Sequence, residues 1–231
     1  MKNFVILGVA GYIAIRHLKA IKETGNNLLA AIDPSDSVGR LDSYFPEADY
    51  FRSFDDFLKN TKLSGNVDFV SICTPNNLHF ENIKTSLLKG FNVICEKPIV
   101  LNERDLNELI TLEKKTNKKV YSILQLRLHD AIKKLKEEIS LSEKKNIYDI
   151  ELTYITSRGK WYAKSWKGNE KKSGGLASNI GIHFFDMLHY IFGRTIYNKV
   201  LFKNEKTIRG ITKMEQARIS WTLSIDENNL P

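Results

Sequence analysis

The chain has 231 residues, 42% of them hydrophobic and 27% charged, which is an ordinary globular composition with room for one large or two small domains. No stretch approaches the roughly 18 to 20 apolar residues of a membrane span, and the first residues lack the long apolar region of a signal peptide, so we expect a cytoplasmic protein. Cys73 and Cys95 have neither metal-ligand nor C-x-x-C spacing, which predicts two buried, reduced thiols.

The net charge of +8 is concentrated in the second half of the chain. Residues 1–122 carry 16 Lys and Arg against 15 Asp and Glu, whereas residues 123–231 carry 19 against 12. This excess favours an anionic partner: a nucleic acid, a phosphorylated metabolite or an acidic sugar. The sequence shows no zinc-finger, RNA-recognition or homeodomain-like pattern, so nucleic-acid binding is the least favoured of the three.

Residues 1–122 alternate between short apolar runs and segments of helical periodicity. The apolar runs, which predict strands, are residues 3–9, 28–33, 67–75, 91–98 and 119–127. The segments that predict helices are residues 13–25, 56–60, 76–90 and 102–117. This alternation predicts an α/β domain over residues 1–122, with a Rossmann-like, doubly wound parallel sheet.

From residue 123 the pattern changes to that of an α+β domain. Residues 146–158 alternate apolar and polar side chains, as an antiparallel strand with one solvated face does. Residues 176–193 predict a helix with one apolar stripe, formed by Ile180, Phe184, Leu188 and Ile191. Three strand-like segments follow, at residues 197–205, 207–213 and 217–226. The second domain, residues 123–231, is therefore expected to be a mostly antiparallel open sheet with helices on one face.

The stretch ILGVAGYIAIRH is a glycine loop between a predicted strand and a predicted helix. Matched to the dinucleotide-binding pattern G-x-G-x-x-G from Gly8, the later glycine positions fall on Ala10 and Ile13. Counted back from the helix, Ala14 can be the small residue at the helix–strand contact, Gly11 can let a pyrophosphate approach, and Gly8 can make the turn. The loop is then one residue longer than the common one. A purely structural turn is the alternative.

Polar residues follow the ends of the predicted parallel strands, where open α/β sheets bind ligands. Asp33 ends the second strand, where a carboxylate accepts hydrogen bonds from the adenosine ribose and repels a 2′-phosphate, so NAD is favoured over NADP. The alternative is that Asp33 and Pro34 only start a turn. The motifs TPNNLH and EKP follow two later strands. In the second motif, Lys97 can donate to a substrate hydroxyl and stabilise negative charge on its oxygen.

Two further polar groups occur in the second half. Asn179 and His183 are four residues apart, so both are expected on one helix face. A histidine beside a polar residue is typical of a general base, and a satisfied core histidine is the alternative. The segment 157–175, SRGKWYAKSWKGNEKKSGG, is basic and aromatic. Its cations can bind phosphates or carboxylates and its aromatic rings can stack on a base or sugar, unless it is only a solvated lysine-rich loop.

In this order the glycine loop, Asp33, TPNNLH, EKP and GG…NIGIHFFD resemble the glucose–fructose oxidoreductase/inositol dehydrogenase (Gfo/Idh/MocA) family, over about residues 3 to 225. The resemblance implies an oxidoreductase that acts on a CH–OH group with NAD and no metal. Within the family, GVAGYIA, QLRLH and the 157–175 segment are similar to members that oxidise the 3-hydroxyl of a UDP-linked, N-acetylated sugar acid for bacterial surface polysaccharide. It also implies a homo-oligomer, a dimer or tetramer, formed through the C-terminal sheet.

The resemblance assigns the site residues. The catalytic residues would be Lys97, His183 and Asn179, with Lys97 binding the reacting hydroxyl and assisting removal of its proton and His183 as the acid/base partner. The cofactor-binding residues would be Gly8, Ala10, Gly11, Tyr12, Ile13, Asp33, Thr74, Pro75, Asn76, Asn77, His79, Glu96 and Lys97. The substrate-binding residues would be Gln125, Arg127, Arg158, Tyr162, Lys164, Trp166, Lys167, Ser173, Asn179 and His183.

The chain departs from the family pattern in three ways, one of which is Asp130 after QLRLH, where proline would be expected. Many relatives have Asp at the position of Asn179, and an amide can neither act as a base nor favour a histidinium. The chain is also shorter than usual, so the last strand and C-terminal helices are expected to be absent. The alternatives are an NAD-binding member without turnover and a dehydrogenase for a different sugar or polyol. We expect oligomer contacts at exposed apolar residues of VLFKNE, residues 200–205, and ISWTLSI, residues 219–225.

Overall fold

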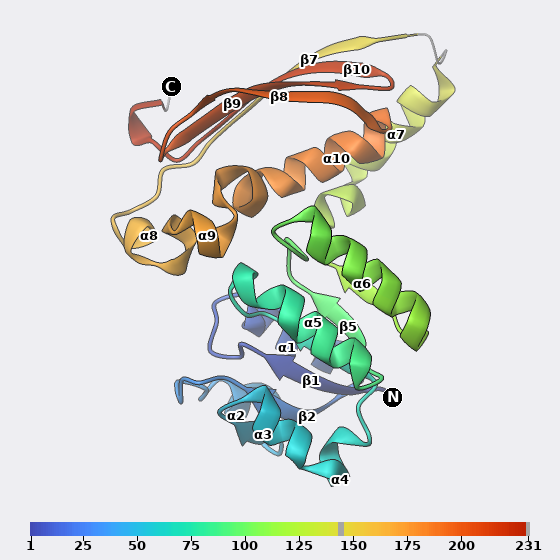
Figure 1. Ribbon diagram of the computed structural model, residues 1–231, viewed down its shortest axis with the longest axis vertical. Coiled ribbons are helices and arrows are strands. Elements are labelled where there is room, and N and C mark those ends of the chain that lie inside the picture. The colour runs from blue at the N-terminus through green and yellow to red at the C-terminus, as the bar shows by residue number, and fades with distance from the viewer. Residues whose placement is uncertain (143–145, 230–231) are drawn as a thin grey trace. The chain divides into compact units, whose positions relative to one another are not determined.

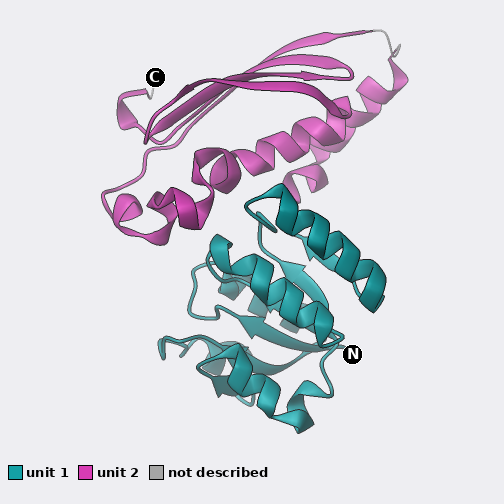
Figure 2. Ribbon diagram, viewed as in Figure 1, with its two compact units in different colours: residues 1–123 teal, residues 124–231 magenta. Residues whose placement is uncertain are grey.

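The computed structural model describes residues 1–142 and 146–229. Its contacts divide the chain into two compact units, residues 1–123 and residues 124–231 (Figure 2). Among the described residues, unit 1 contains two clusters of buried apolar side chains and unit 2 contains one. Each unit therefore has a core of its own.

Unit 1 is built on a six-stranded sheet (Figure 1). Its strands are β1 (Asn3–Leu7), β2 (Asn27–Ile32), β3 (Asp49–Phe51), β4 (Phe69–Ile72), β5 (Asn92–Cys95) and β6 (Val120–Ser122). Their order is β3-β2-β1-β4-β5-β6, and every neighbouring pair is parallel. This order reverses direction at β1, as in doubly wound dinucleotide-binding sheets. The predicted Rossmann-like sheet is confirmed, although the short strand β3 was not predicted.

Apolar side chains cover both faces of this sheet. Val5 and Leu7 lie in one core cluster, whereas Phe4 and Ile6, which alternate with them along β1, lie in the other. A strand buried on both faces needs an uninterrupted apolar sequence, which explains the runs seen in this half of the chain. Cys73 and Cys95 are both buried thiols, as predicted.

Helices connect the strands of unit 1. They are α1 (Ala14–Glu23), α2 (Leu41–Tyr44), α3 (Phe54–Lys59), α4 (Thr61–Ser64), the 3₁₀ turn η1 (Asn76–Leu78), α5 (His79–Leu88) and α6 (Glu103–Thr116). The side chain of Asn102 accepts a hydrogen bond from the backbone N–H of Asp105, 2.9 Å away, and so caps the start of α6. None of the described helices is long and apolar enough to cross a bilayer.

Unit 2 contains a mixed four-stranded sheet. Its strands are β7 (Tyr148–Ile155), β8 (Thr195–Lys203), β9 (Thr207–Met214) and β10 (Ala217–Ser224). In the order β7-β10-β9-β8, the pairs β8–β9 and β9–β10 are antiparallel, but β7 and β10 are parallel. The prediction of a mostly antiparallel sheet is confirmed, but the antiparallel direction predicted for residues 146–158 is wrong. Alternation along a strand shows that one face is solvated and does not show which strand will pair with it.

Helices pack on one face of this sheet, as predicted. The helical segments are η2 (Gln125–Leu128), α7 (Asp130–Leu141), α8 (Trp161–Lys164), η3 (Trp166–Gly168), α9 (Glu170–Ser173), the π-helical segment η4 (Ala177–Gly181), α10 (Ile182–Phe192) and η5 (Glu227–Asn229). Leu188 and Ile191 of α10 and Ile139 of α7 share a cluster with apolar residues of β10. Neither α7 nor the π-helical geometry was predicted.

The expected oligomer contacts of β10 are not exposed. Ile219, Trp221 and Leu223 are at most 3% exposed because these alternate residues of β10 point into the core. The prediction of exposed apolar residues in ISWTLSI is therefore wrong. In VLFKNE the predicted exposure is confirmed, because Val200, Leu201 and Phe202 are exposed along the edge strand β8, whereas oligomer contacts at these residues stay a prediction.

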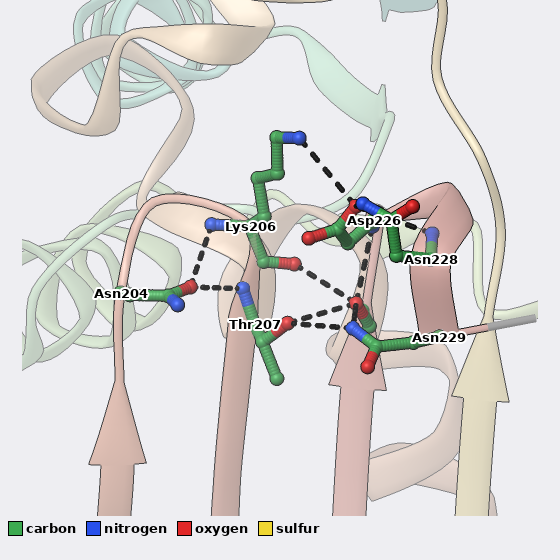
Figure 3. A network of polar contacts seen from close by, with 7 residues as sticks. Asn204, Lys206, Thr207, Asp226, Asn228 and Asn229 are labelled. Carbon is green, nitrogen blue, oxygen red and sulfur yellow. Dashed lines mark hydrogen bonds and ion pairs between the residues drawn. The ribbon is translucent and has the colours of Figure 1, made fainter.

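A polar network ties the β8–β9 turn to the segment after β10 (Figure 3). The side chain of Asn204 accepts hydrogen bonds from the backbone N–H groups of Lys206 and Thr207. The hydroxyls of Thr207 and Ser224 lie 2.8 Å apart, and the amide of Asn229 donates to both. These bonds fix both strand ends at this side of the sheet.

Candidate functional site

The glycine loop of unit 1 passes very close to the end of β4. Gly8 follows β1 with φ +81°, a backbone conformation that favours glycine. A Cβ at this position would lie 2.8 Å from the carbonyl carbon of Cys73 and from the amide nitrogen of Thr74. Gly8 therefore makes the turn and allows the loop to approach β4.

The rest of the loop leads into α1. The amide of Gly11 donates to the carbonyl of Gly8 at 3.0 Å, and a Cβ on Gly11 would lie 3.1 Å from that oxygen. Ala14 is fully buried where α1 begins, and the first turn of α1 contains no acidic residue. A helix start of this kind favours an anion such as a pyrophosphate. Ile13 packs against a core cluster, whereas Tyr12 is 80% exposed.

Asp33 connects the glycine loop to the end of β2. Its carboxylate accepts hydrogen bonds from the amides of Ala10, at 3.0 Å, and Ser35, at 2.9 Å. A carboxylate has about four acceptor positions, so it can also accept from ribose hydroxyls. Arg40, which was not predicted as a site residue, donates to the carbonyl of Gly11 at 2.8 Å. Nothing in the local sequence connects that arginine to the loop.

His79 joins the two loops that follow β4 and β5. It is 0% exposed, and its ring nitrogens lie 2.7 Å from the carbonyl oxygen of Pro98 and 2.9 Å from that of Thr74. Burial lowers the pKa of His79, against the opposing effect of the two carbonyl groups. This residue therefore acts on the site through the two loops that it holds. In the same motif Asn76 is buried, Pro75 is half-buried and Asn77 is exposed.

Glu96 and Lys97 follow β5, and Glu96 meets a residue that was not predicted. The side chain of Glu96 is 14% exposed, and its Oε1 lies 3.1 Å from Nε2 of His17 on α1. Burial raises the pKa of Glu96, but the hydrogen bond and charge of His17, with the charge and backbone N–H of Lys97, outweigh burial and leave the pKa below its ordinary value. Glu96 is thus an ionised group beside Lys97.

The other ring nitrogen of His17 lies 2.7 Å from the hydroxyl oxygen of Ser71 on β4. Ser71, His17 and Glu96 together have the order and spacing of a hydrolase triad. Ser71 is 1% exposed, however, so no substrate carbonyl can reach its hydroxyl. The arrangement supports the site from within and is not a nucleophilic centre.

In unit 2, Asn179 lies in the π-helical segment that precedes α10. The amide Nδ2 of Asn179 donates to the hydroxyl of Tyr162 at 3.2 Å, and both residues are buried. His183 is half-buried in the first turn of α10. π-helical turns occur often at functional sites. The hydrogen bond joins the 157–175 segment to the helix that carries the predicted acid/base pair.

The basic–aromatic segment, residues 157–175, folds into the three short helices α8, η3 and α9. The ammonium of Lys167 lies 5.7 Å from the ring centroid of Trp161 and 5.8 Å from that of Trp166. Arg158 and Lys164 are exposed. Ser173 is fully buried and accepts from the amide of Gly175, so its hydroxyl shapes the segment from within.

Arg127 is paired with an acidic residue that the sequence analysis did not single out. Its Nε donates to Asp186 of α10 at 2.7 Å, and its Nη2 donates to the other carboxylate oxygen. Asp186 raises the pKa of Arg127 further above its ordinary value. No local pattern connects Asp186 with Arg127, which lies 59 residues earlier in the sequence. Gln125, from the same 3₁₀ turn as Arg127, is exposed.

The structure places the predicted site residues of unit 1 at the carboxyl end of its sheet. In unit 2, side-chain contacts connect Asn179 with Tyr162 and Lys167 with two tryptophan rings. The carboxyl ends of β1, β2, β4 and β5 bring together the glycine loop, Asp33, TPNNLH and EKP. Among residues 1–142 and 146–229, no group of three or more His, Cys, Asp or Glu is placed to hold a metal.

Solved structures with closely similar folds include a WlbA (WbpB) dehydrogenase from Thermus thermophilus. Its complex with NAD and UDP-GlcNAcA is 46% identical to this chain with a TM-score of 0.94; the match covers all of this chain and 76% of that one. A second complex of that dehydrogenase, with NAD and α-ketoglutarate, gives 46% identity and a TM-score of 0.95, over 75% of its chain.

Relatives of known sequence are longer than this chain. The myo-inositol 2-dehydrogenase of Thermotoga maritima is 33% identical over 131 residues, which are 57% of this chain and 38% of that protein. The inositol 2-dehydrogenase of Rhizobium meliloti is 26% identical over 194 residues, 83% of this chain and 55% of that protein. The chain therefore spans about half the length of these relatives, or less.

Two family models match the two units. The model described as the oxidoreductase family, NAD-binding Rossmann fold, matches residues 2–123, more than half of the chain. The model of the C-terminal alpha/beta domain of the same family matches residues 136–220. The chain belongs to the Gfo/Idh/MocA family of oxidoreductases.

Proposed function

We propose that the protein is an NAD-dependent dehydrogenase that oxidises the 3-hydroxyl of UDP-N-acetylglucosaminuronate or a closely related UDP-linked sugar acid. The observation that carries the proposal is the match, over the whole chain, to a dehydrogenase crystallised with NAD and UDP-GlcNAcA. The strand-end cluster of unit 1 and the basic–aromatic segment of unit 2 supply the chemistry that such a reaction requires.

The residues at the edge of the unit 1 sheet fit NAD. Because Gly8 and Gly11 have no Cβ, the loop can pack against the chain after β4 and lead directly into α1, whose start can bind a pyrophosphate through its backbone N–H groups. Asp33 can accept from the ribose hydroxyls and would repel a 2′-phosphate, which favours NAD over NADP. When bound, NAD supplies the acceptor for the hydride from C3 of the sugar.

We assign the proton of the reacting hydroxyl to Lys97 and His183. The ammonium of Lys97 would donate a hydrogen bond to the hydroxyl oxygen and stabilise negative charge that develops there. His183, as a neutral ring, would accept the proton as the C–H bond breaks and the C=O bond forms. Asn179 cannot take up a proton, so its place is to orient, and its bond to Tyr162 fixes that amide.

The anionic parts of the substrate are assigned to unit 2. Lys167, held over two tryptophan rings, combines a cation with flat apolar surfaces, which suits a phosphate beside a sugar or uracil ring. Arg127 already gives Nε and Nη2 to Asp186, so Nη1 would meet a substrate carboxylate. The surplus of positive charge in this half of the sequence agrees with a doubly phosphorylated, carboxylated ligand.

We also propose that the protein forms a homo-oligomer through the unit 2 sheet. The exposed apolar side chains of β8 support this, because a row of them on an edge strand favours association. Sedimentation of the protein at several concentrations would test it, and a single monomeric species throughout would contradict it. The cytoplasmic location stays a prediction, in keeping with two buried cysteine thiols.

The test of the activity is turnover of the UDP-linked sugar acid with NAD. NADH absorbance should rise, and mass spectrometry should find the 3-keto sugar nucleotide. A parallel reaction contains α-ketoglutarate, because an α-keto acid can reoxidise NADH that stays bound. If the protein instead binds NAD without turnover, NAD will raise the melting temperature but no keto product will form. That outcome would refute the proposal.

The role of Lys97 is tested by Lys97→Met. We expect kcat/KM to fall by about a hundredfold or more, because the group that binds the reacting oxygen is lost. The stabilisation by NAD should remain. Lys89→Met, a change of the same kind at an exposed position in unit 1, should leave turnover unchanged. Full turnover in the Lys97 variant would contradict the assignment.

A further inference from the structure

A buried chain of hydrogen bonds lies between α1 and the strand ends of unit 1. The hydroxyl of Ser71 is 2.7 Å from Nδ1 of His17, and Nε2 of His17 is 3.1 Å from Oε1 of Glu96. Ser71 and His17 are buried, and the side chain of Glu96 is nearly so. The three residues come from α1, β4 and the loop after β5, so these hydrogen bonds connect three parts of the unit 1 fold.

The chemistry of the partners fixes what each atom does. A carboxylate oxygen can only accept, so Nε2 of His17 donates to Glu96. The hydroxyl of Ser71, on the far side, shares a hydrogen bond with Nδ1 of the ring and can serve as donor or acceptor. The imidazole is thereby held at both ends, and its orientation does not depend on solvent. A group fixed in this way can hold the next one in place.

Glu96 passes this constraint on to Lys97. Glu96 directly precedes Lys97 in the sequence, and the charge and the backbone N–H of Lys97 both lower the pKa of the Glu96 carboxyl. A nearly buried carboxylate whose other contacts were lost would move toward water or take up a proton, because burial disfavours its charge. Either change would release the backbone of Lys97 from its partner.

We propose that His17 is a positioning residue that, through Glu96, holds Lys97 in the orientation needed for its reaction. The proposal rests on the role assigned to Lys97 in the proposed function. His17 does not touch the substrate in this scheme. Its substitution should therefore change how fast bound substrate reacts more than how well substrate or cofactor binds.

Two variants of His17 test its two hydrogen bonds separately. Gln has the length to bring an amide N–H to the place of Nε2, so His17→Gln keeps a donor for Glu96 and loses the contact with Ser71. Asn is shorter and reaches the place of Nδ1, so His17→Asn keeps the contact with Ser71 and loses the donor. The two variants remove similar amounts of packing, so a merely structural role predicts similar effects.

The first measurement is hydrogen exchange of backbone amides by NMR, which needs no turnover. We expect exchange of the Lys97 amide to become about tenfold faster in His17→Asn and to stay near the wild-type rate in His17→Gln. The amides of Val70 on β4 and Val93 on β5 report general loosening of the sheet and should stay within about twofold in both variants. Equal effects on the Lys97 amide in the two variants, or no effect in either, would overturn the proposal.

The second measurement is the kinetics of the same variants. In His17→Asn we expect kcat to fall by about tenfold or more with little change in KM for either substrate, and in His17→Gln we expect most of kcat to return. A loss of equal size in both variants, or a change in KM alone, would contradict positioning. If the wild type shows no turnover, the proposed function fails, whereas the exchange experiment still decides whether His17 orders Lys97.

Discussion

Gly8 shows how a single residue determines whether the glycine loop of the candidate site can form. Two separate constraints act on it: a positive φ, and backbone atoms of Cys73 and Thr74 where a Cβ would lie. Gly25 has the first constraint alone, because φ is +68° and nothing lies within 4 Å of its Cβ position. The pair therefore separates backbone strain from steric overlap.

For Gly25→Ala we expect a loss of about 1 to 2 kcal/mol in the free energy of unfolding, the cost of a left-handed backbone for a residue with a Cβ. For Gly8→Ala we expect a further loss of about 1 to 3 kcal/mol from overlap with the chain after β4. Urea denaturation followed by circular dichroism measures both. Equal losses would show that the loop moves away from β4 at little cost.

The residues of the candidate site differ in how far sequence reveals them. Gly8, Asp33 and Lys97 belong to short motifs at strand ends, so their place follows from local pattern. His17, Arg40 and Asp186 do not, because each is recognised only by a partner that is distant in the chain: Glu96, the carbonyl of Gly11, and Arg127. From sequence alone, a histidine on the buried face of a helix looks the same as an ordinary core residue, because its partner cannot be identified.

At the scale of elements, a buried hydrogen bond joins the basic–aromatic segment to the helical segment after it. The hydroxyl of Tyr162 accepts from the amide of Asn179, which lies within a π-helical turn. Regular α-helical spacing was expected here, and the sequence contains no proline to mark the change. Long-range packing around Gly181, where a Cβ would lie 2.6 Å from the side chain of Leu223, accompanies the wider turn.

The contact between these elements is tested by Tyr162→Phe. We expect a loss of about 1 kcal/mol in the free energy of unfolding, because the buried amide of Asn179 loses a partner. We also expect kcat to fall by about tenfold as that amide loses its orientation, while stabilisation by NAD stays the same. Tyr197→Phe removes the same hydroxyl from an exposed position on β8 and is the control. Equal kinetics in the two variants would argue against a link between the segment and the helix that carries the proposed acid/base residue His183.

Elements that sequence failed to predict are short or lack a local signature. Strand β3 has three residues, too few for a period of two to show. Whether β7 pairs in parallel depends on its neighbour β10, which lies far along the sequence, so the residues of β7 alone do not show it. By contrast, the strands of unit 1 that are buried on both faces were predictable because their runs are continuously apolar.

At the scale of the whole molecule, acid should destabilise unit 1 in two steps. The lowered pKa of His79 means that below its ordinary value of 6.5 the unfolded chain takes up a proton that the folded chain does not, so stability falls as pH falls from there. The lowered pKa of Glu96 gives stability that is complete above its ordinary value of 4.5 and is lost as pH falls through the folded value. Both groups therefore lower the free energy of unfolding as the pH falls.

The first step is measured with His79→Gln, which keeps an amide donor and removes the titrating ring. The wild type should lose up to about 1.4 kcal/mol per pH unit below pH 6.5 from this group, and the variant should show a flatter profile. The three tryptophans all lie in unit 2, so hydrogen exchange of β4 and β5 reports on unit 1 where tryptophan fluorescence would not. His129→Gln, at an exposed position, should keep the wild-type slope. Identical slopes for wild type and His79→Gln would contradict the assignment.

The position of β10 within its sheet has a consequence for how the protein is made. In unit 1, β1 comes before the other five strands of its sheet in the sequence and lies in the middle of that sheet, so later strands can add outward on either side as synthesis continues. In unit 2, β10 is the last of the four described strands along the sequence and lies between β7 and β9. Until residues 217–224 have emerged, β7 lacks its neighbour in the sheet and the apolar face of α10 lacks Trp221 and Leu223. Unit 1 can therefore fold during translation, whereas unit 2 must hold an incomplete core until β10 arrives, and this interval is when it is most exposed to aggregation.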